Sequence, residues 1–62
     1  MTTYVRLTRY VKRYGIAVDS RRIDGVWYYQ VQLGADGPLE WHKEIECDII
    51  TEEEFDDYLG GL

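Results

Sequence analysis

Residues 16–33, IAVDSRRIDGVWYYQVQL, consist of two apolar-rich segments on either side of Asp24-Gly25. A two-residue type I′ turn needs positive φ at both central positions, and Asp-Gly tolerates that conformation. The stretch therefore predicts a β-hairpin that turns at Asp24 and Gly25. The predicted cross-strand partners are Arg22 with Trp27, Ser20 with Tyr29, Val18 with Val31, and Ile16 with Leu33.

Towards the C-terminus, residues 34–38 (GADGP) suit a five-residue hairpin connection to a third strand. From Leu39 to Ile49 the sequence alternates between apolar and polar residues, with one exception. Pairing Leu33 with Leu39 sets Trp41 opposite Val31 and Ile45 opposite Trp27, so that one apolar face continues across three strands. The exception is Lys43, which this register places on the apolar face beside Tyr29.

The last segment carries the signals of a helix start. Thr51 followed three residues later by Glu54 forms a capping box, and Glu52 and Glu53 suit the positive end of a helix. The expected helix ends at Gly60-Gly61. Its expected apolar side consists of Phe55, Tyr58, Leu59 and Leu62.

The N-terminal segment fits two interpretations. On a helical wheel its apolar side chains gather within about 120° and its basic ones fill the opposite arc, which predicts an amphipathic helix closed by Gly15. The apolar arc holds Tyr4, Leu7, Tyr10, Val11 and Tyr14. The many Thr, Val and Tyr residues favour a strand instead.

We therefore expect an α+β fold over one domain, residues 1–62: a helix, a three-stranded antiparallel meander and a second helix, with both helices on the apolar face. The alternative makes residues 3–14 a fourth strand of a small barrel-like sheet that carries only the C-terminal helix.

Composition narrows the class of protein. The chain of 62 residues is 45% hydrophobic and 15% aromatic, which is too apolar for a disordered segment. One cysteine forms no intrachain disulfide, and the sequence carries neither a leader pattern nor an apolar run long enough to cross a membrane. These features predict a cytoplasmic protein that does not insert into a membrane.

Charge is divided unevenly along the chain. Residues 1–31 hold six Arg or Lys and two Asp, a net charge of +4, whereas residues 32–62 hold one Lys and ten Asp or Glu, a net charge of −9. Such a chain can pair its halves internally, associate with a copy of itself, or present one sign to a partner.

Catalysis and metal binding have little support in the sequence. The predicted strand places Cys47 and His42, the only histidine, on opposite faces, so no nucleophile meets a base, and Cys47 is expected in the core. His42 and its alternate carboxylates lie about 7 Å apart along a strand, which is too wide for one zinc ion. We expect no enzyme, no metal and no cofactor.

The leading hypothesis is a protein-interaction module with an acidic surface. The carboxylates of the helix and third strand approach the charge spacing of duplex DNA, which predicts a nucleic-acid mimic or inhibitor that binds a partner with a basic surface. A small protein of this kind also fits a phage or mobile-element origin. The expected acidic surface comprises Glu40, Glu44, Glu46, Asp48, Glu52, Glu53, Asp56 and Asp57.

A second contact surface is expected on the other sheet face. Ile23, Val26 and Tyr28 should form an exposed apolar patch there, rimmed by Arg21, Glu44 and Glu46, and such patches are typical of protein contacts. Because the chain is small and has no disulfide or metal, a homodimer is also expected.

The alternative function is nucleic-acid binding. It would use a basic stripe on the first helix together with the first hairpin. The residues are Arg6, Arg9, Arg13, Arg21 and Arg22. The acidic start of the C-terminal helix would repel phosphates, which makes nucleic acid the second choice.

Overall fold

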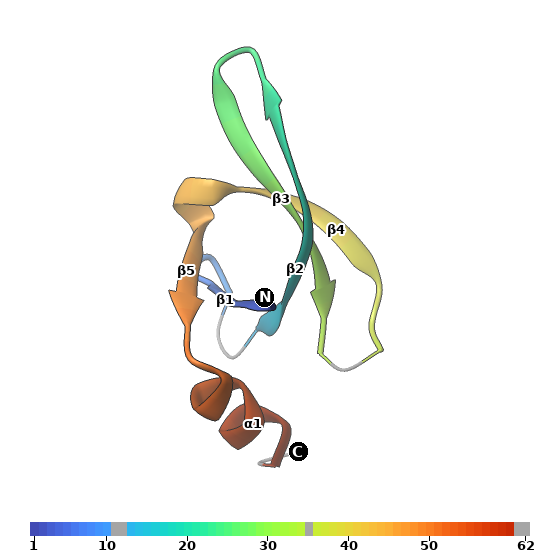
Figure 1. The fold of residues 1–62 in the computed structure, drawn as a ribbon, viewed down its shortest axis with the longest axis vertical. Helices are drawn as coiled ribbons and strands as arrows, with labels where there is room; N and C mark the ends of the chain where they lie inside the picture. Colours follow the sequence, from blue (N-terminus) through green and yellow to red (C-terminus); the bar gives the residue numbers. More distant parts are fainter. Residues whose placement is uncertain (11–12, 35, 61–62) are drawn as a thin grey trace.

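The computed structural model describes residues 1–10, 13–34 and 36–60. It is a small α+β domain in which a five-stranded antiparallel open sheet carries one C-terminal helix (Figure 1). The elements are β1 (Thr3–Leu7), β2 (Tyr14–Ile23), β3 (Val26–Leu33), β4 (Leu39–Lys43), the 3-10 turn η1 (Glu44–Glu46), β5 (Cys47–Ile50) and α1 (Glu52–Gly60). The strand order is β4-β3-β2-β1-β5, so the last strand returns beside the first.

The expected N-terminal helix is wrong, because the segment begins with strand β1. β1 pairs antiparallel with β2 on one side and β5 on the other. Period-2 alternation turns both Val5 and Leu7 inward, where they are fully buried. The helical wheel left Val5 outside its apolar arc, so the strand buries a side chain that the helix would have exposed. The alternative of an N-terminal strand is correct for residues 3–7 only, and its barrel-like sheet is wrong because the five strands form an open sheet.

The hairpin at Asp24-Gly25 is confirmed. Asp24 has φ 51° and Gly25 has φ 79°, as a type I′ turn requires. The predicted pairs of Arg22 with Trp27 and Ser20 with Tyr29 are also correct.

Farther from the turn, a β-bulge at Val18 changes the register between β2 and β3. Val31 pairs with Ala17 instead of Val18, and Leu33 pairs with Gly15 instead of Ile16. Gly15 therefore lies inside β2 and does not cap a helix. A Cβ atom there would overlap the Gln32 carbonyl oxygen and Val31 Cγ1, so the close approach of β3 requires glycine.

The connection between β3 and β4 spans residues 34–38 as predicted, but the register after it is shifted by one residue. The loop is closed by hydrogen bonds from Leu33 N to Pro38 O and from Gly37 N to Leu33 O. Its first pair is Gln32 with Leu39, so Trp41 lies opposite Gln30 and not Val31. Paired residues share a face, and therefore Trp41 and Trp27 lie on opposite faces of the sheet. The single apolar face expected across three strands is wrong.

The predicted third strand is interrupted. η1 separates β4 from β5, and β5 pairs with β1 and not with β3. Ile45, which was expected opposite Trp27, lies in η1 and is 85% exposed.

The C-terminal helix begins as predicted. Glu54 N donates to Thr51 Oγ1 over 3.1 Å, and the Thr51 hydroxyl donates to Glu54 Oε1. Phe55 contacts Tyr4 with ring centroids 4.9 Å apart, and Tyr58 stacks on Tyr14 at 4.4 Å. Because no second helix is present among the described residues, the expectation of two helices on one face is wrong. Leu62 lies outside the described residues.

The core lies on the inner face of the sheet. It consists of Val5, Leu7, Val31 and Cys47, with Ala17, Tyr29 and Leu33 packed against them. Tyr4 alternates with Val5 along β1, so α1 packs on the opposite, outer face. Residues 19–30 of β2 and β3 extend away from this core and project at the end of the molecule opposite α1 (Figure 1); we call this segment the hairpin arm.

Candidate functional site

The expected apolar patch is assembled on the outer face of the hairpin arm. Ile23 and Val26 are cross-strand partners, and Tyr28 lies on the same side two residues along β3. Ile23 is 48% and Val26 41% exposed, while Tyr28 is half-buried. The three side chains are therefore adjacent and accessible.

The structure adds Trp41 to this patch, a residue that the predicted register had placed in the core. Trp41 lies opposite Gln30 on the outer face and remains 40% exposed. The Arg21 guanidinium lies 5.1 Å from its ring centroid, a cation-π contact that orients Arg21. We call Arg21, Ile23, Val26, Tyr28 and Trp41 together the extended patch.

The rim of this patch differs from the prediction. Arg21 borders it as expected, but Glu46 is turned towards Arg9, with its side chain only 22% exposed. Glu44 lies in η1. Lys43 pairs with Tyr28 on the outer face, so the residue that did not fit the predicted register belongs to this surface.

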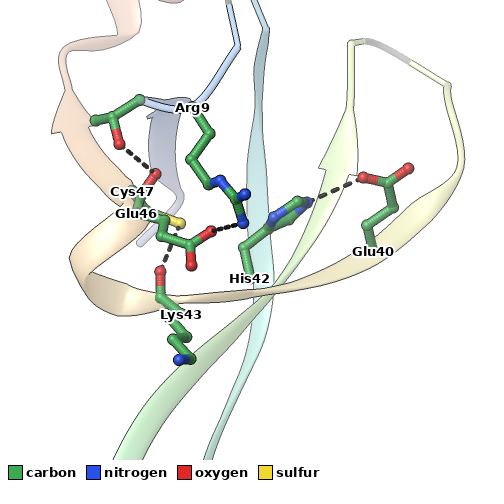
Figure 2. Close-up of polar contacts among 7 residues, drawn as sticks. Arg9, Glu40, His42, Lys43, Glu46 and Cys47 are labelled. Carbon is green, nitrogen blue, oxygen red and sulfur yellow. Dashed lines mark hydrogen bonds and ion pairs between the residues drawn. The ribbon is translucent and has the colours of Figure 1, made fainter.

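Three of the eight residues of the expected acidic surface bind cationic or histidine side chains of the same chain. Asp48 accepts a hydrogen bond from Arg6 over 2.7 Å, and this contact raises the pKa of the guanidinium. The carboxylates of Glu46 and Glu40 lie 3.6 Å from Arg9 and 2.9 Å from His42, respectively (Figure 2). The two oppositely charged halves of the chain thus partly neutralise each other.

The remaining acidic residues concentrate on α1. Glu52, Glu53, Asp56 and Asp57 are all exposed, and none of them forms an ion pair with another described residue. Their spacing of three and four residues places them on one side of the helix, away from Phe55. We call these four residues the acidic stripe; Glu44 lies apart from it.

The five arginines of the nucleic-acid hypothesis do not form the predicted stripe. Arg6 and Arg9 bind carboxylates, and Arg13 lies 5.0 Å from the ring centroid of Tyr10. Arg21 and Arg22 are neighbours in β2 and therefore point to opposite faces. The helix that was to align the first three is replaced by β1 and the turn after it.

His42 lies on the inner face of the sheet. The sequence had predicted that it would lie on the solvent-exposed face. Its side chain is 11% exposed, and Nε2 lies 2.9 Å from Glu40 Oε1 (Figure 2). The Tyr10 ring meets it edge-on at 6.4 Å. The one-residue register shift turns Glu40 and His42 inward, and Lys43, the exception in the alternation, was its one sign in the sequence.

Cys47 is the core residue that the sequence predicted. It is buried beside Leu7, its strand partner, and Sγ donates to the Lys43 carbonyl oxygen over 3.5 Å. Burial, followed by the charges of Glu46, Asp48 and Glu44, raises the pKa of the thiol to about 11. A thiol held protonated in this way is a poor nucleophile.

A shallow groove opens where β2, α1 and the loop between β3 and β4 meet. It is lined by Arg13, Tyr14, Leu33, Gly34, Pro38, Glu40 and Tyr58. Its charged side chains already contact Tyr10 and His42. Among residues 1–10, 13–34 and 36–60 no group of three His, Cys, Asp or Glu side chains is arranged to hold a metal ion. No helix in the described part of the chain has the length and apolar character of a membrane span.

Comparison of the chain with models of known protein families, with curated protein sequences and with solved structures gave no match.

Proposed function

We propose that this chain is a non-enzymatic protein-interaction module that presents the acidic stripe of α1 to a partner with a basic surface. The observation that carries the proposal is the position of Asp56 and Asp57, two exposed carboxylates beyond the first turn of a nine-residue helix. Neither residue has a partner in an ion pair with a described residue.

The acidic stripe is unfavourable for the helix itself. Glu52 with Asp56 and Glu53 with Asp57 are like-charge pairs at i, i+4, each costing about 0.2 to 0.5 kcal/mol. Capping and the helix dipole account for acidic residues in the first turn, but negative charge near the C-terminal end opposes the dipole. α1 also has no basic residue in its last turn to offset this charge. The acidic stripe therefore does not stabilise the helix, which supports a role in binding.

The charge spacing suits a groove that binds nucleic acid. Residues 52–57 rise about 9 Å along a helix axis, at roughly 1.5 Å per residue. Duplex DNA carries one charge per about 1.7 Å of its axis, and the acidic stripe together with Glu54 places five carboxylates within this length, which approaches that density. An inhibitor that occupies the basic groove of a nucleic-acid-binding protein is the form of the proposal that this spacing favours.

The test is the double substitution Asp56→Lys/Asp57→Lys. It leaves the Thr51–Glu54 cap intact and creates favourable Glu–Lys pairs at i, i+4, so the free energy of unfolding should stay equal or rise slightly. We expect the immobilised wild type to capture proteins from a nuclease-treated lysate of the source cells, and added duplex DNA to release them. The double variant should not capture these proteins.

The matched control is Asp19→Lys/Glu44→Lys, which replaces two exposed carboxylates of β2 and η1 by Lys and so changes the net charge by the same amount outside α1. This control should capture the same proteins as the wild type. Equal capture by the α1 variant and the wild type, measured by quantitative mass spectrometry, would contradict the proposal.

A further inference from the structure

The hairpin arm is the part of the sheet with the least cover from the rest of the chain. Residues 18–27 are all exposed, and the strands there extend past the core (Figure 1). Both faces of the arm carry large apolar side chains, with Ile23 and Val26 on the outer face and Trp27 on the other. An isolated two-stranded ribbon is marginally stable in water, so a surface that covers one face would stabilise it.

The outer face of the arm has the composition of a binding hot spot. Trp, Tyr and Arg are the residue types that dominate protein contacts, and the extended patch contains one of each. Arg21 is already held against the Trp41 ring, so ordering it on binding costs little further entropy.

The charges beside the extended patch select its occupant. Arg21 and Lys43 lie at the same level of the arm, since both are paired with Tyr28. They would repel the basic partner that suits the acidic stripe. Carboxylates lie on either side of these two cations along the arm. Asp24 is exposed at the tip, and Asp19, the partner of Gln30, is exposed on the outer face nearer the core, so this surface holds both signs of charge.

A surface of this kind is complementary to a second copy of itself. When two arms lie antiparallel, the tip of each reaches the middle of the other, and Asp24 of one copy approaches Arg21 and Lys43 of the next. Ile23 and Val26 then cover Tyr28 across the axis. A two-fold arrangement satisfies both copies identically and closes without further growth.

We propose that two copies of this chain associate through the extended patch with their hairpin arms antiparallel. α1 lies at the opposite end of the molecule from the arm (Figure 1), so this dimer carries its two acidic stripes at its far ends. A dimer of this form is bivalent, and a partner with two basic sites would bind it more tightly than it binds one chain.

Sedimentation equilibrium over a micromolar-to-millimolar series tests the association. We expect twice the chain mass of 7.3 kDa at the upper end and dissociation on dilution. Val26→Asp should raise the dissociation constant at least about tenfold, because it buries a charge in the contact of each copy. Trp27→Asp is the matched control, since it changes the neighbouring residue on the opposite face and should leave the dissociation constant unchanged.

A double-mutant cycle tests the antiparallel arrangement. Asp24→Asn keeps a residue that the turn favours, and Arg21→Gln removes the facing charge. Each should raise the dissociation constant about 2- to 10-fold, and the double variant no more than the larger single effect, because the two residues meet across the axis. Circular dichroism of each variant confirms that the sheet is retained.

Three results would overturn the proposal: the mass of one chain at every concentration, an equal loss with Trp27→Asp, or additive effects in the cycle. A monomer that captures a different protein in a Val26-dependent manner would assign the arm to that protein instead. The α1 variant Asp56→Lys/Asp57→Lys should dimerise normally, so failure of the dimer and failure of the acidic stripe are separate results.

Discussion

Cys47 shows how much the environment of a single residue determines its chemistry. The thiol lies in the core, three acidic neighbours surround it in sequence, and its pKa is raised to about 11. At pH 8 the native protein should react with a thiol reagent such as DTNB at least about tenfold more slowly than the unfolded chain, even though a thiolate of higher pKa is the better nucleophile. Burial slows the reaction further. Rates measured with and without guanidinium check this, and equal rates would contradict the buried position.

The same raised pKa makes stability depend on pH in a defined direction. The thiol in the unfolded chain ionises near its ordinary value of 9.0, whereas the folded thiol stays protonated until about pH 11. The contribution of Cys47 to stability is therefore complete below pH 9 and is lost as the pH rises from 9 to 11. Cys47→Ala has no thiol to ionise. Between pH 9 and 11 the unfolding free energy of the wild type should therefore fall relative to that of Cys47→Ala.

At the scale of elements, the sequence was a reliable guide wherever one local rule determined the geometry. The Asp24-Gly25 turn and the Thr51 cap were both predicted, because each depends on residues within three positions of one another. The strand register after the β3–β4 loop, which depends on hydrogen bonds within that loop, was not predicted. Lys43 was the one available sign of the shift after β3, since the observed register removes it from the core.

The cap of α1 gives a prediction at this scale. Thr51→Ala removes the acceptor for Glu54 N and should lower the free energy of unfolding by about 1 kcal/mol. Loss of the cap loosens the first turn, which holds Phe55 against Tyr4. Thr51→Ser retains the hydroxyl and should behave like the wild type in urea unfolding. If the Ala and Ser variants lost equal stability, the methyl group of Thr51 would be the important feature and not its cap.

At the scale of the whole molecule, the sequence indicated the class of fold but not its topology. The β-rich centre and the C-terminal helix follow from local patterns, whereas β5 returns to pair with β1, with 40 or more positions between paired residues. That pairing adds β5 to the edge of the sheet, where it places Cys47 opposite Leu7 in the core and brings Asp48 to Arg6. Two predicted members of the acidic surface, Asp48 and Glu46, are therefore paired with arginines that no local rule connects to them.

This topology predicts that stability is unevenly distributed. The core occupies one end of the sheet, while the hairpin arm adds strand length with little buried surface. Amide hydrogen exchange should therefore be slowest at Val5, Leu7 and Val31, and fastest within the sheet between Arg21 and Tyr28. The arm can open while the core stays folded, because its hydrogen bonds have few packed side chains above or below them.

Exchange measured by NMR at two protein concentrations distinguishes an inherently mobile arm from a covered one. In Val26→Asp the arm should exchange at the same rate at both concentrations, whereas in the wild type its protection should increase with concentration as the second copy covers the outer face. Exchange in the core should be similar in both proteins. Uniform protection from Val5 to Tyr28 in Val26→Asp would mean that the arm is as stable as the core without a second copy, and the physical reason for covering its outer face would then be lost.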